Sequence, residues 1–272
     1  MWVLPVLLYG LFKGAREIAK KKALEKSGVM EVLFVYTLLS FLFVVPDAGN
    51  AMGLSGTQLL CVLAKSAVIF VAWICGFQAI ARLPVSLYSV LDLSRVIFST
   101  LLGVCFLGEQ MRTGQSIGLV LVLCGLLLLK APWKKKGGDA DVSAGAVALA
   151  LTSCLMNAVS GTMDKVLMRG MNSSQLQFWY MLFLTAMYGA YLLFSRTKIH
   201  WKGTLKNGWI WLMSALFVVA DRALFLANGM PGSQVTVMTL LKQSGVLVSI
   251  LGGYLVFHEK HVGYRLACAS LV

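Results

Sequence analysis

Charged side chains are scarce in this sequence, and their scarcity excludes a soluble protein. Asp, Glu, Lys and Arg make up 13% of the 272 residues, whereas soluble domains average about 25%. Hydrophobic residues make up 58% of the chain, and the mean hydropathy is +0.80. A soluble core of this length could not bury so much apolar side chain, so lipid must surround it. The sequence therefore predicts an all-α integral membrane protein.

Residue patterns that carry metal, disulfide or hydrolytic chemistry are also missing. The six cysteines lie inside apolar segments without a CxxC pair, and the three histidines lie at the ends of predicted spans. HExxH and GxSxG motifs are absent. We therefore expect no catalytic residue, no metal and no cofactor, and we expect that the protein is not an enzyme. An integral-membrane enzyme and a membrane scaffold are the alternatives outside transport.

Acidic residues are outnumbered, with 11 Asp and Glu against 24 Lys and Arg and a net charge of +13. Most of the basic residues lie in short connectors between hydrophobic segments. That placement is typical of a cytoplasmic membrane face that contacts anionic lipid headgroups. We therefore expect the lipid bilayer as a partner, and not a nucleic acid.

Hydrophobic segments of membrane-spanning length follow one another along the whole chain, since about 20 apolar residues cross a bilayer. The predicted spans are residues 2–22, 29–46, 58–81, 84–107, 114–131, 143–168, 175–195, 208–228 and 233–257. A tenth span begins near His261 and is too short to cross, so we expect a truncated sequence. A basic linker at residues 132–142 separates a first repeat, residues 1–131, from a second, residues 143–272.

The hydrophobic pattern of the first half occurs again in the second half. At an offset of 150, residues 84–110 align with residues 234–260. Identical pairs at this offset or at an offset of 144 include Ser94/Ser244, Glu109/Glu259, Lys21/Lys165 and Tyr36/Tyr180. Each repeat holds five spans, an odd number, so the second must enter the membrane opposite to the first. Inverted repeats with a site between them are typical of secondary transporters.

Several short segments, in a fixed order and partly duplicated, carry a family resemblance. They are Pro84 in the third connector, FLGEQ at residues 106–110 and GLVLVLCG at residues 118–125, with GMPGSQV at residues 229–235 and VFHEK at residues 256–260 as second copies. In this order the sequence resembles the drug/metabolite transporter superfamily in its ten-span, EamA-like form. The resemblance covers essentially the whole chain.

The resemblance implies ten transmembrane helices, arranged as two inverted five-helix repeats around a central cavity. It implies that the first, third, fourth, sixth, eighth and ninth spans line this cavity. The fifth and tenth spans would lie at the periphery. Gly118 and Gly125 put small residues on one face of the fifth span, which suits a neighbouring helix or a second copy of the chain. A homodimer through the fifth and tenth spans is therefore one expected arrangement.

Polar side chains inside the predicted spans are the candidates for a binding site. A charge at the centre of a bilayer costs about 2.5–3.5 kcal/mol, so it tends to face a wet cavity or a partner. The candidate substrate-binding residues are Lys13, Glu17, Tyr88, Asp92, Arg95, Asn157, Asp221, Lys242 and Gln243. Helical spacing pairs Lys13 with Glu17. The same rule pairs Asp92 with Arg95. The alternative to a binding site is that these ion pairs only stabilise the helix bundle. Lys242 takes the place of Asp92 in the second repeat.

Lys13 and Asn157 set the expected charge of the cargo. Small multidrug-resistance transporters are single-repeat relatives with an essential glutamate on their first span. When their pattern is aligned to residues 157–165, Asn157 stands at the position of that glutamate. At the repeat offset of 144, the equivalent residue of the first half is Lys13. This departure argues against the export of polyvalent cations and favours a cargo with a carboxylate or phosphate. A lysine that only reaches a headgroup is the alternative.

The sequence thus predicts a secondary-active transporter of small polar metabolites, amino-acid-like or sugar-like and anionic or zwitterionic. It would work by alternating access and act as an exporter, with an exchanger of phosphorylated or nucleotide-linked sugars as the alternative. If protons are coupled to transport, Glu17, Asp92 and Asp221 are the candidate carboxylates. The expected location is the inner or plasma membrane, crossed many times. Family precedent places the amino terminus in the cytoplasm, whereas lysines 20–22 and 134–136 favour the reverse by the positive-inside rule.

Overall fold

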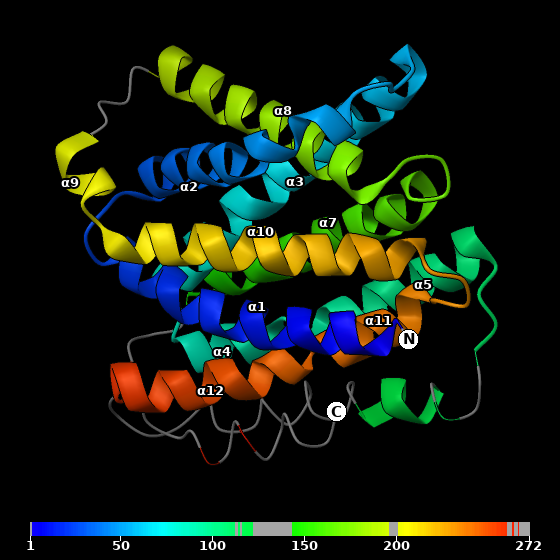
Figure 1. The fold of residues 1–272 in the computed structure, drawn as a ribbon. Coiled ribbons are helices and arrows are strands. Elements are labelled where there is room, and N and C mark those ends of the chain that lie inside the picture. The colour runs from blue at the N-terminus through cyan, green and yellow to red at the C-terminus, as the bar shows by residue number, and fades with distance from the viewer. Residues whose placement is uncertain are drawn as a thin grey trace.

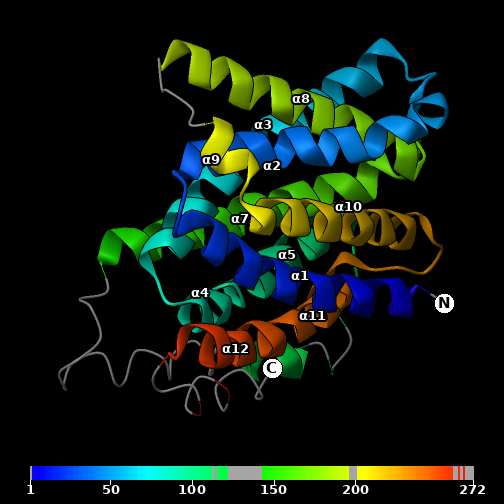
Figure 2. The ribbon, with the colours of Figure 1, turned by 60° about the vertical axis from the view of Figure 1, so that its left-hand side comes forward.

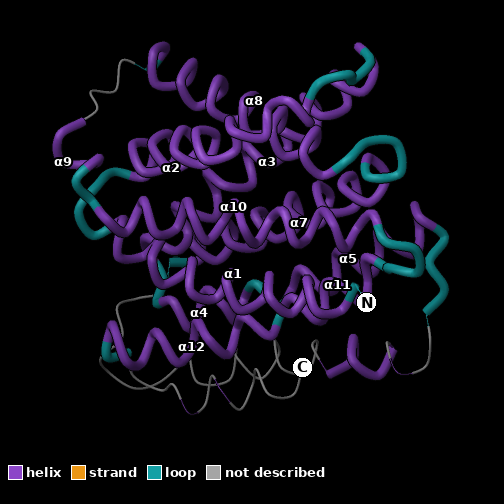
Figure 3. Tube along the Cα trace, in the orientation of Figure 1, coloured by secondary structure: helices purple, strands orange, loops and turns teal. Residues whose placement is uncertain are grey.

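The computed structural model describes residues 2–111, 114, 116–121, 143–195, 201–259, 263 and 266 of the chain. Within these residues all regular structure is helical, and Figure 3 shows the helices joined by loops. Seven segments are long and apolar enough to cross a membrane. They confirm a multi-span, all-α membrane fold. Most of the fifth span, the linker and most of the tenth span lie outside the described residues, so the count of ten, the truncation and the homodimer stay predictions.

In the described part of the first half, six helical elements have defined bounds (Figure 1). They are α1 (Val3–Leu24), α2 (Val29–Val44), the 3₁₀ helix η1 (Val45–Ala51), α3 (Gly56–Arg82), α4 (Val85–Leu91) and α5 (Ser94–Leu107). The second half contributes another six, α7 (Ala144–Leu167), α8 (Ser173–Phe194), α9 (Trp201–Leu205), α10 (Gly208–Gly229), α11 (Val235–Lys242) and α12 (Ser244–Phe257). Their bounds agree with eight of the predicted spans, except that the fourth and ninth spans are each divided in two.

Side-chain caps explain where several of the helices begin. The Ser55 hydroxyl accepts a hydrogen bond from the Gln58 backbone N–H at 3.3 Å, and the Gln58 side chain accepts one from the Ser55 N–H at 2.9 Å. Asn172 and Gln175 form the same reciprocal pair at the start of α8. Such capping boxes satisfy donors that the first turn of a helix leaves without partners.

The fourth and ninth spans break at equivalent positions, which the sequence analysis did not predict. In the fourth span, the Leu93 N–H donates to the Val90 carbonyl at 3.1 Å. In the ninth, the Gln243 N–H donates to the Leu240 carbonyl at 3.0 Å. These bonds span three residues rather than four, so one tight turn interrupts each helix. Discontinuous helices at matching places in two halves are typical of transporter binding sites.

Two glutamates join the halves by reciprocal contacts, which we call the glutamate clamps. Glu109, just after α5, accepts hydrogen bonds from the backbone N–H groups of Val235 and Thr236 at 2.6 and 3.1 Å, and from the Thr236 hydroxyl. Glu259, just after α12, accepts bonds from the N–H groups of Val85 and Ser86 at 2.6 and 3.1 Å, and from the Ser86 hydroxyl. Each carboxylate thus caps the first turn of the other half's broken helix. All partners differ by 150 in number, as a pseudo-two-fold relation between the halves requires.

Lys21 and Lys165, aligned at an offset of 144, also play matching parts. The Lys21 ammonium donates to three carbonyl oxygens at the end of α3, those of Ile80, Ala81 and Leu83, at 2.7–3.1 Å. The Lys165 ammonium donates to the Asn228 carbonyl at the end of α10, at 2.9 Å, and to the Ser233 hydroxyl. Cations stabilise helix carboxyl ends because the final carbonyls lack intrahelical partners.

Helix α1 lies at the centre of the bundle, between α10 and α12, in both ribbon views (Figures 1 and 2). Its contact with α12 is possible only because both helices carry glycine there. A Cβ on Gly245 would lie 2.1 Å from the Gly10 carbonyl oxygen, and one on Gly14 would lie 2.4 Å from the Gly245 carbonyl oxygen. Small residues allow such close approach of membrane helices. The charged face of α1 is therefore held against the other helices.

Candidate functional site

A cavity of about 80 Å³ lies inside the bundle, between the two halves. Its walls come from α1, α3, α4, α5, α7, α10 and α11, which belong to the six spans that the family resemblance implied. Helices α2 and α8 also reach it, through Tyr36 and Tyr180. These two tyrosines are an aligned pair of the repeat, so their matched positions were a signal that could have identified them from the sequence.

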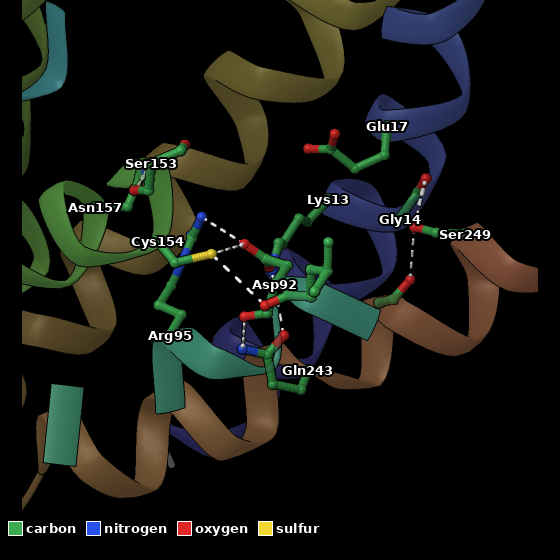
Figure 4. Close-up of polar contacts among 12 residues, drawn as sticks. Lys13, Gly14, Glu17, Asp92, Arg95, Ser153, Cys154, Asn157, Gln243 and Ser249 are labelled. Carbon is green, nitrogen blue, oxygen red and sulfur yellow. Dashed lines mark hydrogen bonds and ion pairs between the residues drawn. The ribbon is translucent and has the colours of Figure 1, made fainter. Parts of the chain in front are cut away.

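Most of the predicted binding residues meet at this cavity. Those that line it are Lys13, Glu17, Tyr88, Arg95, Asn157, Asp221 and Lys242. The other two, Asp92 and Gln243, lie behind Lys13, at the breaks of the two divided helices. The Lys13 ammonium donates to the Asp92 carboxylate and, at 3.3 Å, to the Gln243 side-chain carbonyl (Figure 4). Lys13 is thus held by both broken helices at once.

The pairing expected from helical spacing is correct for one pair and wrong for the other. Arg95 Nη2 lies 2.8 Å from Asp92 Oδ1, so this pair forms as predicted. Lys13 does not pair with Glu17. Its partner is Asp92, and Glu17 instead accepts from the Lys20 ammonium at 2.6 Å. Packing of α1 against α4 brings the Asp92 carboxylate to Lys13, while Glu17 pairs with Lys20 on the next turn of α1.

Lys20 also corrects the assignment of connector charges. The sequence analysis used it as a connector charge, although the predicted first span, residues 2–22, contains it; α1 continues to Leu24 and Lys20 is 7% exposed. Its ammonium lies 4.8 Å from the centre of the Phe77 ring, in the wall of the cavity. One of the charges used to argue for an external amino terminus is therefore a site residue.

Three further charged residues of the wall were not selected from the sequence. Lys65 Nζ lies 3.1 Å from Asp164 Oδ1 and 3.9 Å from the centre of the Tyr180 ring. The third residue is Arg16, whose guanidinium carbon lies 5.0 Å from the centre of the Phe217 ring. They lie inside predicted spans, so their position in the membrane was the available signal, and only tertiary contacts show that they share a cavity.

Two cations of the cavity wall form no ion pair with any residue that the structure describes. Nε and Nη1 of Arg16 are buried without a hydrogen-bond partner. The Lys242 ammonium lies 5.8 Å from the centre of the Tyr9 ring. Together with Lys13, Lys20, Lys65 and Arg95 they face four carboxylates, those of Glu17, Asp92, Asp164 and Asp221. The surroundings of the cavity therefore carry a net positive charge.

Aromatic rings form the remaining wall. Tyr36 lies 5.3 Å from both Trp73 and Phe217, measured between ring centres, and 6.0 Å from Phe77. One ring of this aromatic cluster, that of Phe217, gives the Arg16 guanidinium a low-polarity neighbour. Electrostatic interactions made there are stronger than in water, because few solvent dipoles compete for the charge.

Comparison with known proteins identifies the architecture. Residues 1–131 match the EamA-like transporter family. This match confirms the predicted family over the first repeat, residues 1–131. Among solved structures, 28 chains match this EamA-like protein significantly. One, a crystal structure described only as that of a protein, is 15% identical, covers 99% of this chain and 93% of its own, and has a TM-score of 0.70. That likeness shows a shared fold alone. The search of curated proteins gave no match.

The family match indicates the general role of the protein. It is a multi-pass integral membrane protein and a membrane transporter of the drug/metabolite type. The family is one of transporters, which agrees with the expectation that the chain is not an enzyme. In the described residues, no group of His, Cys, Asp and Glu side chains is arranged to hold a metal ion.

Proposed function

We propose that this EamA-like protein is a secondary-active transporter that exports small anionic or zwitterionic metabolites across the inner or plasma membrane by alternating access. The observation that carries the proposal is the pair of cavity cations, Arg16 and Lys242, without a carboxylate partner among the described residues. The aromatic cluster beside Arg16 supplies apolar contact area for the rest of an amino-acid-like or sugar-like cargo.

The charge of the wall favours an anion over a cation as cargo. A buried cation without a partner is costly in a membrane, by about 2.5–3.5 kcal/mol on insertion scales. A carboxylate or phosphate on the cargo would accept charge-assisted hydrogen bonds from the Arg16 guanidinium and the Lys242 ammonium. A cationic cargo would instead add a like charge to surroundings that are already positive. Position 13 also favours an anion, because it holds a lysine where small multidrug-resistance transporters carry a glutamate.

The size of the cavity supports a mechanism in which the halves move. Ligand sites usually measure about 300–1,000 Å³, several times the present volume of about 80 Å³. A metabolite can therefore enter only if the helices separate on one side. The breaks at Leu93 and Gln243 supply joints inside the fourth and ninth spans, and the glutamate clamps hold the outer ends of these spans. Release of one clamp at a time would give alternating access.

A phosphorylated or nucleotide-linked sugar is the second candidate cargo class. The two unpaired cations favour it, because a phosphate group offers up to two negative charges and three acceptor oxygens to them. In this reading the protein is an exchanger. The same cavity residues would bind the phosphate, so the two classes are separated by ligand preference and not by site.

A thermal-shift screen of the purified protein tests the class of cargo. The probes are glutamate, glucuronate, alanine, glucose 6-phosphate, UDP-glucose and tetraphenylphosphonium. A ligand present at 100 times its Kd stabilises the folded state by about 2.7 kcal/mol. We expect stabilisation by the anions or by alanine, and exchange of phosphorylated sugars would be indicated by stabilisation with glucose 6-phosphate or UDP-glucose alone. Stabilisation by tetraphenylphosphonium alone would overturn the proposal.

Variants assign the binding to the cavity cations. Arg16→Met and Lys242→Met keep much of the apolar side chain and remove the charge, so each should weaken the binding of an anionic probe at least tenfold. Lys22→Met is the matched control, because Lys22 pairs with Glu25 on the exposed end of α1. Counterflow of labelled probe into proteoliposomes then separates a transporter from a scaffold or an enzyme, which would move nothing.

A further inference from the structure

Among the carboxylates that surround the cavity, Asp221 differs from the other three in its partners. Asp92 pairs with Lys13 and Arg95, Glu17 pairs with Lys20, and Asp164 pairs with Lys65. Asp221 forms no ion pair with any residue that the structure describes. Its Oδ2 accepts a hydrogen bond from the Tyr180 hydroxyl at 3.0 Å, and its Oδ1 accepts none from these residues.

This difference decides which carboxylate can take up a proton at low cost. Protonation of Glu17, Asp92 or Asp164 would neutralise one member of a buried ion pair and leave its cation without compensation. That loss is strongly unfavourable in a low-dielectric interior. Protonation of Asp221 at Oδ1 breaks no ion pair and leaves the Tyr180 hydrogen bond to Oδ2 in place. The sequence could not choose among its candidates, and the contacts choose Asp221.

The surroundings of Asp221 link its proton to the charge of the cargo. The titratable and charged groups that face it are Tyr9 and Arg16 from α1, Tyr36 from α2, Lys65 from α3, Asp164 from α7, Tyr180 from α8 and Lys242 from α11. Of the three cations, Lys65 is already paired with Asp164. The two that remain, Arg16 and Lys242, are the groups assigned to the cargo. Their positive charges favour an ionised Asp221 as long as the cavity holds no anion.

We infer that Asp221 binds a proton when an anionic cargo occupies the cavity, so that proton and cargo cross the membrane together and export follows the outward gradient of the cargo itself. The inference rests on the proposed function. The negative charge of the cargo offsets Arg16 and Lys242, and the carboxylate of Asp221 loses the field that kept it ionised. A proton from water then binds to Oδ1. With one anionic charge and one proton bound, the loaded cavity carries the same net charge as the empty one.

Proton uptake by the purified protein on addition of an anion tests this linkage without transport. Sodium glutamate and sodium glucuronate are suitable probes, since neither changes its own protonation near pH 7. In weak buffer, saturation of the wild-type protein should raise the pH by an amount equal to one proton bound per probe molecule. Release of protons on binding would overturn the inference, and so would binding without any proton change.

The Asp221→Asn variant assigns the proton to one side chain. Uptake should fall from one proton per bound probe to none, a ratio that is independent of any change in affinity. Asp47→Asn is the matched control, because Asp47 pairs with Arg222 at 2.5 Å, away from the cavity. The control should keep one proton per probe. Uptake that persists in Asp221→Asn would overturn the assignment.

A transport measurement gives the direction of coupling and covers the case in which Asp221→Asn does not fold. Wild-type proteoliposomes that contain a pH-sensitive dye should acidify inside as external glutamate or glucuronate enters. Alkalinisation inside would show exchange of proton for cargo and would overturn the inference. If no anion binds or moves at all, the proposed function itself fails, an outcome that is distinct from binding without protons. The Tyr180→Phe variant should shift the pH at which transport is half-maximal, since it removes the hydroxyl that donates to Oδ2.

Discussion

Replacement of Glu109 by alanine removes the carboxylate of one glutamate clamp. Three hydrogen bonds are lost, two from the backbone N–H groups of Val235 and Thr236 and one from the Thr236 hydroxyl. A hydrogen bond to a charged group contributes about 1.5–3 kcal/mol, and loss of a helix cap costs about 1 kcal/mol. Because Glu109 is only half-buried, water replaces part of the loss. We therefore expect Glu109→Ala to lower the free energy of unfolding by about 2–4 kcal/mol.

The assay is unfolding in mixed micelles with increasing dodecyl sulfate, followed by circular dichroism. Glu109→Gln keeps an acceptor oxygen without the charge and should lose about half as much, about 1–2 kcal/mol. A double-mutant cycle of Glu109→Ala with Thr236→Val should give a coupling of about 1 kcal/mol for the hydroxyl contact. The control is Glu25→Ala, which removes an exposed pair with Lys22 and should cost less than about 0.5 kcal/mol. A loss in Glu109→Ala no larger than in this control would refute the role of the clamp.

Two further predictions concern α1. Gly245→Val should prevent the close approach of α12 to the Gly10 carbonyl, 2.1 Å from a Cβ at that position, and size-exclusion chromatography should show loss of monodisperse protein. Gly208→Val, at a position where a Cβ meets no atom within 4 Å, should elute as the parent does. Lys13→Met should cost about 3 kcal/mol in the same micelle titration, because it breaks a buried ion pair, and the double variant with Asp92→Asn should lose less than the sum of the two single losses. Additive losses in the double variant would contradict the pairing.

Much of the fold could be predicted because membrane crossing imposes a length and a hydropathy that a sequence displays directly. The bounds of α3 and α10 agree with the predicted spans to within two residues. The breaks of the fourth and ninth spans could not be predicted in this way, since neither contains proline or glycine at the turn. The trace in the sequence is polar residues at matched positions, Asp92 with Lys242 and Ser94 with Ser244. A turn of three residues leaves almost no mark on hydropathy.

The sequence predicted where the site lies, but it predicted the wrong ion-pair partner for Lys13. Lys13, Asp92 and Lys242 were selected because they are charged and lie inside predicted spans. A charge there needs a compensating contact, since its insertion into the membrane is costly. Which carboxylate meets which cation depends on helix packing, and Lys13 and Asp92 are 79 residues apart in the sequence. Local spacing favoured Glu17 for Lys13, and the crossing of α1 with the broken fourth span decided otherwise.

The glutamate clamps also have a consequence for how the chain matures during synthesis. The donors at the start of α4 belong to the first half, whereas their acceptor, Glu259, is translated about 175 residues later. Until the ribosome has delivered that residue, the clamp at the start of the fourth span cannot form. The first half therefore completes this contact only after the last described helix, α12, has been synthesised.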